Sequence, residues 1–313
     1  MLKFPSNILM LDPVYTHHIL VVEKSTHMLH LFKNDEKFPT YLHSYKIATG
    51  ATTGDKTFRG DKKTPEGIYQ LTEFKSAVDL KNMYAKEGQK YGNGAFTLNY
   101  PNRFDQLKKK TGGGIWLHST DDESRIAKGL DSRGCVVVAQ TDLVDLSKYI
   151  ELNSTPIVIV QDFNFLRKDS WEKNRSNIIS FIDTWIKSWS DENINQYISH
   201  YHSQYSSGIP NRTTITQWKK YKKAVFSNPG SPIIKAENIS ALVENNYAVV
   251  SFQQHYKSNS INDVGKKTLY LKRDRKYQWK IITEKWNKIS RNNAIAFTPS
   301  VRFFNNNSQK DGI

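Results

Sequence analysis

The stretches GIWLHST (114–120) and DSRGCV (131–136) decide how this sequence is interpreted. The first contains His118 at the end of an apolar run, and the second contains Cys135, 17 positions later. A cysteine attacks only as the thiolate, so a catalytic cysteine needs a basic or positive neighbour, normally a histidine within hydrogen-bond reach. Cys135 is the only cysteine in 313 residues, which excludes an intramolecular disulfide and a multi-cysteine metal site. Reactivity or packing remains as the reason for its presence.

The residues around Cys135 suit a nucleophile. Gly134 lets the backbone approach closely, so its N–H and that of Cys135 could donate to the oxyanion of a tetrahedral intermediate. Arg133 would favour the thiolate or bind a substrate carboxylate. The alternative is a buried structural cysteine before the run Val136–Val138 and a histidine that merely ends a strand. For an isolated pair this alternative would be favoured, because free cysteines are commonly buried.

The flanking sequence on both sides is β-rich. Short apolar runs separated by turns fill residues 19–74, and PIVIV at 156–160 is typical of a buried strand. The glycine-rich segment 49–67 predicts a long exposed loop, a place where substrate is often held, and from it we expect Lys56 and Arg59 to bind substrate carboxylates. Residues 76–114 show no clean period. After the cysteine, Thr141 or Asp142 could cap a short helix with apolar positions at Leu143, Leu146 and Ile150.

The character of the chain changes after residue 162. Apolar residues at helical intervals between 178 and 189 predict a long amphipathic helix, with a shorter helix after Asp191. Residues 234–286 predict three or more long strands with hairpin breaks at 244–246 and 273–275. This order indicates a separate α+β domain. Its aromatic residues could line a pocket, although core packing explains most of them: Trp185, Trp189, Tyr197, Tyr201, Phe252, Tyr256, Trp279 and Trp286.

The motif H-S-T followed by S-R-G-C-V, with the upstream loop ending T-P-E-G-I-Y, resembles the L,D-transpeptidase (YkuD) catalytic domain over roughly 18–161. The resemblance implies that Cys135 is the nucleophile, His118 the general base, and the Gly134 and Cys135 N–H groups the oxyanion hole. It also implies that Ser132 shapes the turn. We place Ser132, Ser119 and Trp116 with Arg133, Arg59 and Lys56 among the expected substrate contacts.

Three positions depart from the family pattern. Ser119 stands where glycine is common, Arg133 where a second histidine is frequent, and Val137 where many members have arginine. These departures leave the mechanism intact and affect the choice of substrate and acceptor.

The whole layout resembles the cell-shape-determining murein L,D-carboxypeptidases, which carry a C-terminal NTF2-like domain. The fold class expected is a mainly β YkuD-like catalytic domain plus an α+β NTF2-like domain. We expect an N-terminal extension at 1–17, the catalytic domain at 18–162, the NTF2-like domain at 163–304 and a disordered tail at 305–313. The second domain is expected to bind glycan or a partner and to do no chemistry.

The resemblance implies a peptidoglycan L,D-carboxypeptidase that removes the terminal D-Ala from stem tetrapeptides through a cysteine acyl-enzyme and affects cell shape. An L,D-transpeptidase that forms 3-3 cross-links or exchanges D-amino acids uses the same acylation motif. A non-catalytic wall-binding protein is the alternative from another class. A catalytic Cys135 should be alkylated unusually fast near neutral pH, and alanine at His118 should abolish that reactivity.

The formal charge of +15 attracts acidic partners, and the partner expected here is the meso-diaminopimelate–D-Ala end of a stem peptide rather than nucleic acid. The lysine-rich stretch 218–226 is interpreted as a solvated amphipathic face. No apolar run is long enough to span a membrane, and the opening residues lack a signal core. The protein is therefore cytoplasmic or had a signal peptide removed, and because of the motif we favour the second and a periplasmic location. A homodimer remains open.

We expect neither a metal nor a cofactor. Five histidines lie in the first strands without a known ligand spacing, and the glycine-rich loop lacks GxxxxGK[ST], because Asp55 follows Gly54 before Lys56. The histidines are His17, His18, His27, His30 and His43.

Overall fold

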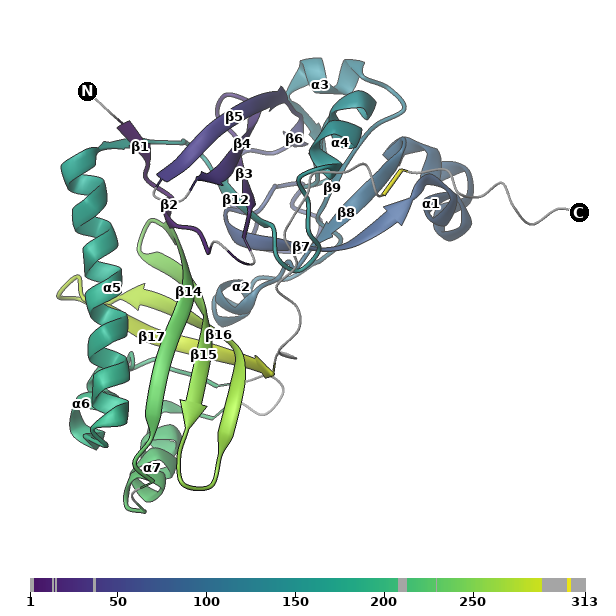
Figure 1. The fold of residues 1–313 in the computed structure, drawn as a ribbon. Helices are drawn as coiled ribbons and strands as arrows, with labels where there is room; N and C mark the ends of the chain where they lie inside the picture. Colours follow the sequence, from purple (N-terminus) through teal and green to yellow (C-terminus); the bar gives the residue numbers. More distant parts are fainter. Residues whose placement is uncertain are drawn as a thin grey trace, which may run out of the picture. The chain divides into compact units, whose positions relative to one another are not determined.

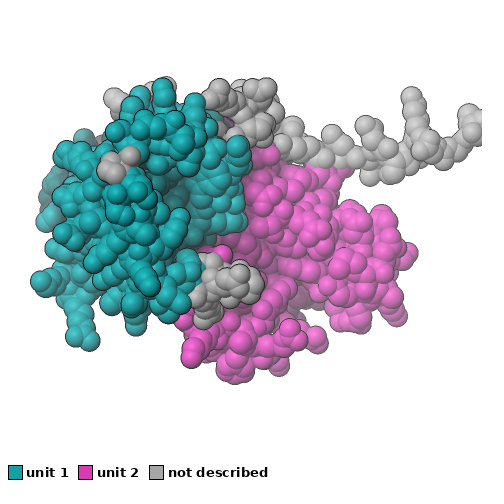
Figure 2. Space-filling view, turned by 90° about the horizontal axis from the view of Figure 1, so that it is seen from below, with its two compact units in different colours: residues 1–15, 36–39, 164–295 teal, residues 16–35, 40–163, 296–313 magenta. Residues whose placement is uncertain are grey.

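A computed structural model describes residues 3–12, 14, 16–35, 38–207, 213–228, 230–288 and 303–304. The chain divides into two compact units, which Figure 2 colours separately. The N-unit consists of Thr16–Asp35, Thr40–Phe163 and Ala296–Ile313, and the C-unit of Met1–Tyr15, Glu36–Pro39 and Asn164–Ile295. The tail expected to be disordered, 305–313, lies outside the described residues. No helix in the described part of the chain is both long and apolar enough to cross a bilayer.

The N-unit is built on an eight-stranded mixed sheet (Figure 1). Its centre is fully apolar, because Ile157, Val158 and Ile159 of β12 and their parallel neighbours in β3 are inaccessible to solvent. Such strands are covered on both faces, which explains their unbroken apolar runs. In sheet order the strands are β11 (Val136–Val137), β9 (Trp116–His118), β8 (Gly94–Leu98), β7 (Gly67–Ser76), β12 (Pro156–Val160), β3 (His18–Glu23), β4 (Met28–Asp35) and β5 (Phe38–Lys46).

The aperiodic segment 76–114 contains more regular structure than its sequence predicts. Two of its helices begin with a capping box, one from Ser76 and Asp79 and the other from Asn102 and Asp105. Each is too short for an apolar period to emerge. The elements are α1 (Ala77–Tyr84), the 3-10 helix η1 (Ala85–Tyr91) and α2 (Arg103–Leu107), with β8 between the last two.

The helix expected after the cysteine is present as α4 (Gln140–Ser147). Leu143 and Leu146 lie on α4 as predicted, whereas Ile150 follows its end, and all three are fully buried. The predicted cap was wrong: the helix begins after Ala139, with no side-chain cap. Two short elements complete this unit: α3 (Ser124–Lys128), and the parallel pair of β6 (Thr49–Gly50) with β10 (Leu130–Ser132).

The C-unit contains helices and a five-stranded antiparallel sheet (Figure 1). The long helix α5 (Lys168–Ser190) and the shorter α6 (Ile194–Ser199) confirm the two predicted helices, and both predicted hairpin breaks are confirmed as well. A third helix, α7 (Ile215–Phe226), occupies the lysine-rich stretch. In sheet order the strands are β17 (Trp279–Lys288), β16 (Asn262–Arg273), β15 (Tyr247–Lys257), β14 (Ile233–Glu244) and β2 (Ile8–Met10).

Residues from the two ends of the chain belong to the cores of different units. In the C-unit, β1 (Lys3–Pro5) pairs with β13 (Phe165–Arg167), β2 pairs with β14, and the Trp171 indole donates to the carbonyl of Ile8 at 2.8 Å. The residues expected as an extension therefore supply strands to this unit. In the N-unit, Phe303 and Phe304 pack on Phe74 with ring centroids 5.1 Å away.

Candidate active site

Strand pairing brings the two halves of the motif together. The parallel strands β9 and β11 set Leu117 opposite Val136 and His118 opposite Val137. Side chains alternate between the faces of a sheet, so Cys135, directly before β11, projects on the same face as His118. Leu117 and Val136 project the other way and have no exposed surface. The apolar halves of both stretches thus fix His118 and Cys135 in position.

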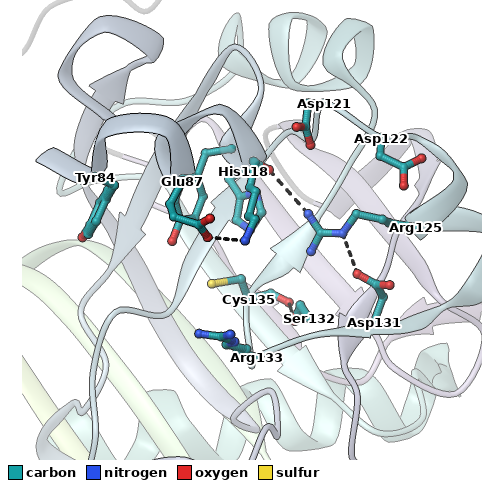
Figure 3. Close-up of a pocket in the computed structure, with 12 residues that line it drawn as sticks. Tyr84, Glu87, His118, Asp121, Asp122, Arg125, Asp131, Ser132, Arg133 and Cys135 are labelled. Atoms are coloured by element: carbon teal, nitrogen blue, oxygen red, sulfur yellow. Dashed lines mark hydrogen bonds and ion pairs between the residues drawn. The ribbon is translucent and has the colours of Figure 1, made fainter. Parts of the chain in front are cut away.

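Cys135 and His118 line one pocket of about 710 Å³ in the N-unit (Figure 3). One wall comes from α1 and η1, and another from the segment between β9 and β10. Figure 3 shows His118 and Cys135 side by side, with Arg133 beyond the cysteine. The lining is aromatic and charged: Tyr84, Glu87, Lys90, Tyr91, His118, Asp121, Asp122, Arg125, Asp131, Ser132, Arg133 and Cys135.

The backbone fixes the tautomer of His118. Its Nδ1 lies 2.5 Å from the carbonyl oxygen of Ser119, which can only accept a hydrogen bond. Nδ1 therefore carries the proton and Nε2 has the free lone pair. The ring of Tyr91 meets the imidazole edge-on at 4.9 Å. Burial lowers the pKa of His118 to about 4, so the imidazole is neutral at pH 7 and able to accept a proton.

Burial also keeps Cys135 neutral. It raises the pKa of the thiol to about 11, although the Trp116 N–H and the charges of Arg125 and Lys56 act in the opposite direction. The thiol donates a hydrogen bond to the carbonyl of Gly114 at 3.5 Å. The site thus holds a neutral thiol beside a neutral imidazole, and the fast alkylation expected from sequence does not follow from this geometry.

Ser132 and Gly134 form the turn before Cys135. The Ser132 hydroxyl donates to the carbonyl of Cys135 at 2.7 Å and accepts the N–H of Gly134 at 3.0 Å. Gly134 has φ +122°, and a Cβ there would lie 2.7 Å from the carbonyl oxygen of Lys63. Two N–H groups were expected to stabilise the oxyanion, those of Gly134 and Cys135. The Gly134 N–H already donates to the Ser132 hydroxyl, whereas the described residues supply no acceptor for the Cys135 N–H. The Cys135 N–H is therefore the one available to an oxyanion.

Only some of the other predicted substrate residues line the pocket. Arg133 is exposed and lines the pocket with Ser132, whereas Lys56, Arg59, Ser119 and Trp116 are outside its lining. Lys56 is buried and paired with Asp61 at 2.6 Å. The Ser119 hydroxyl accepts the Asn93 N–H at 2.7 Å, the Trp116 ring packs on Tyr91 at 5.0 Å, and Arg59 is exposed.

Sequence reasoning missed Arg125, which projects into the pocket from α3. Its Nε donates to Asp131 at 2.5 Å and its Nη1 to the Thr120 hydroxyl at 3.2 Å. Its charge acts on both His118 and Cys135. Arg125 lies in the segment between the two halves of the motif, where an arginine in a short helix gives no chemical signal.

The aromatic residues of the C-unit pack on one another. Trp185 meets Trp189 at 5.3 Å, and the Lys222 ammonium lies 4.5 Å from the centre of the Trp218 ring. Trp286 is 38% exposed and so lies outside this interior. Core packing is therefore the better description for most of the predicted aromatic set.

Comparisons with known proteins agree with this division. Residues 17–159 match the family described as the L,D-transpeptidase catalytic domain, YkuD, and residues 177–285 match the Cds6 C-terminal NTF2-like domain. The chain therefore carries a YkuD-type catalytic domain followed by an NTF2-like domain, and the predicted fold class is confirmed. This family acts on peptidoglycan.

The similarity extends over nearly the whole chain in solved structures. Bd1075 of Bdellovibrio bacteriovorus is 29% identical with a TM-score of 0.80, covering 92% of this chain and 99% of its own. The helical cell shape determining protein Pgp2 of Campylobacter jejuni is 24% identical with a TM-score of 0.68, covering 91% of this chain and 94% of its own. A search of curated proteins gave no match.

Proposed function

We propose that this protein is a peptidoglycan L,D-carboxypeptidase that removes the terminal D-Ala from stem tetrapeptides and leaves tripeptides. The observation that carries the proposal is the neutral His118, with Nδ1 fixed by the Ser119 carbonyl, in one pocket with the only thiol of the chain. A base with a fixed lone pair beside a cysteine is the arrangement that nucleophilic acyl transfer needs.

The reaction begins from the neutral pair. His118 Nε2 takes the proton of the Cys135 thiol as Sγ attacks the carbonyl carbon of meso-diaminopimelate, and the Cys135 N–H donates to the resulting oxyanion. The C–N bond then breaks, and His118 returns the proton to the amine of D-Ala. A thioester remains. Water attacks it with His118 as base, which releases the tripeptide carboxylate and restores the thiol.

The acceptor in the second half of the reaction separates the two enzymatic alternatives. An L,D-transpeptidase would transfer the same acyl group to an amine, forming a 3-3 cross-link or exchanging a D-amino acid. The full-length likeness to a helical cell shape determining protein supports an effect on cell shape. The two-domain layout, which resembles that of the murein L,D-carboxypeptidases, favours hydrolysis. A periplasmic location follows from this substrate. A non-catalytic wall-binding protein is the alternative from another class.

The test is mass spectrometry of purified tetrapeptide muropeptide after incubation with the wild type and with Cys135→Ala, with and without an added D-amino acid. Tripeptide from the wild type alone establishes the carboxypeptidase. Cross-linked or exchanged product establishes the transpeptidase. If both proteins leave the muropeptide unchanged, the enzymatic proposal fails and wall binding is favoured.

A further inference from the structure

The guanidinium of Arg125 is held in place before any ligand arrives. Nε donates to Asp131 at 2.5 Å, and Nη1 donates to the Thr120 hydroxyl at 3.2 Å and to the Lys90 carbonyl at 3.4 Å. The described residues provide no acceptor for its Nη2. Figure 3 shows the group reaching towards the space beside His118 and Cys135. An arginine fixed in this way loses little side-chain freedom when it binds an anion.

The other cations of the pocket are less suited to this task. Lys90 is more than half exposed and is paired with Glu87 across η1. Arg133 is exposed, and water weakens the interactions of exposed charges. The Arg125 side chain is only 19% exposed. Of these three, Arg125 is also the one whose charge acts on both His118 and Cys135.

The acids of the pocket do not cancel this site. Asp131 is shared between Arg125 and Lys128, whose Nζ lies 3.5 Å from its Oδ2. Asp121 and Asp122 are exposed, so water weakens their attraction for the guanidinium, and Glu87 is paired with Lys90. Asp131 thus orients the guanidinium through Nε, and the N–H groups of Nη2 remain available for a ligand.

We propose that Arg125 binds the α-carboxylate of the residue that leaves, and that it thereby selects peptides with a free C-terminus. This inference rests on the proposed hydrolysis. With the scissile carbonyl at Cys135 Sγ, the carboxylate of a single leaving residue lies about 3.5 Å further along the peptide. Arg125 lines the same pocket as Cys135 and its charge acts on the thiol, so its guanidinium is the largely buried cation available to this carboxylate. An amidated or extended peptide lacks the charge at this point and is a poor substrate.

Kinetics on two matched peptides test the proposal. The tetrapeptide with a free terminal carboxylate and the same peptide as its C-terminal amide are compared for the wild type, Arg125→Gln and Lys128→Gln. Lys128→Gln removes the same charge and the same Asp131 partner, but Lys128 is outside the pocket lining. We expect Arg125→Gln to lower kcat/KM for the acid roughly ten- to a hundredfold, mainly through KM, with less than about a threefold effect on the amide. An equal loss on both peptides overturns the proposal.

A conservative variant separates binding from misfolding. Arg125→Lys keeps the charge but loses the fork, so the acid peptide should show an intermediate loss and the amide almost none. A loss on both peptides that matches Arg125→Gln would mean that the side chain only supports the loop, and the proposal would fail.

A readout that needs no turnover keeps this inference distinct from the proposed function. Cys135 is the only thiol, so its alkylation at pH 9 by anionic iodoacetate and by neutral iodoacetamide can be measured directly. Arg125→Gln should lower the ratio of the two rates several-fold, and Lys128→Gln should leave it unchanged. A lowered ratio without peptide turnover in the wild type retains the anion site and rejects the hydrolase. Turnover with an unchanged ratio and equal peptide losses rejects the anion site alone.

Discussion

The pocket of the N-unit and the interior of the C-unit both place ionisable groups among aromatic rings, with opposite results. In the pocket, burial keeps His118 and Cys135 neutral beside an open space of about 710 Å³. In the C-unit, the protein's own side chains occupy the space. The Lys222 ammonium lies within 6 Å of four ring centres, and Lys267 is paired with Glu284 at 2.6 Å. A shifted pKa among aromatics therefore indicates a reactive site only where there is room for a substrate.

The largest expected effect is on turnover. His118→Gln removes the base and should lower kcat for tetrapeptide hydrolysis by roughly a thousandfold, because general base catalysis typically contributes 10²–10⁴. Release of D-Ala measures it. Lys267→Met, assayed below its unfolding transition, should stay within about twofold of the wild type. If His118→Gln kept a near-normal kcat, the pocket of the N-unit would be no more reactive than the packed interior of the C-unit.

The next effect is on stability and belongs to the C-unit. Lys267→Met leaves the buried Glu284 carboxylate without its partner and should lower the free energy of unfolding by about 3–5 kcal/mol. Urea denaturation measures the change. The double variant Lys267→Met/Glu284→Leu should recover most of it, because no buried charge then remains unpaired. Similar losses in the single and double variants would show that packing, not charge, is responsible.

Acid should destabilise the N-unit through its buried histidines. Burial lowers the pKa of both His18 and His118 to about 4, below the ordinary value of 6.5. The unfolded chain therefore binds more protons, and the resulting stability is complete above pH 6.5 and is lost as pH falls towards 4. Each histidine contributes at most about 3 kcal/mol. Unfolding free energies at pH 7 and 4.5 should differ less in His18→Gln and in His118→Gln than in the wild type.

The smallest expected effect concerns Lys222. Burial lowers the pKa of its ammonium to about 8, and this cost is offset by contacts with the surrounding rings. Lys222→Met removes both the cost of burying the charge and the contacts of the ammonium with the rings. The free energy of unfolding should therefore change by no more than about 1 kcal/mol. A loss above about 2 kcal/mol in urea denaturation would mean that the aromatic contacts dominate.

The sequence predicted the pair His118 and Cys135 because their chemistry is carried by a short local pattern. It also predicted α5 and the hairpins of the C-unit, whose periods are long. Lys56 was assigned to substrate, whereas it pairs with Asp61 five residues later. That spacing was visible in the sequence, but nothing in a loop indicates which acidic neighbour a lysine will meet.

Other features depend on long-range contacts that no local pattern carries. The side of α7 that faces the core of the C-unit includes Lys222, whose ammonium packs against aromatic rings. A lysine counts as polar in a sequence pattern, so the stretch was interpreted only as a solvated face. Arg125 gains its significance from the pocket that it shares with His118, Cys135 and the residues of η1, which the sequence does not bring together.

The structure also alters how the role of the second domain can be tested. Removing residues 165–313 would delete Phe303 and Phe304, which pack on Phe74 in the core of the N-unit. It would also leave β1 and β2 without their partners. Loss of turnover in such a fragment would not distinguish a binding role from a damaged catalytic domain, so substitutions such as Lys267→Met are the better test.

The pairing of β2 with β14 has a consequence for the order in which the C-unit folds. Ile8 and Met10 pair with Leu242 and Ala241, more than 230 positions away in the sequence. Closing so long a loop costs conformational entropy before the contacts of the sheet can repay it. We therefore expect β2 to join the sheet late, after the consecutive hairpins of β14 to β17 have formed.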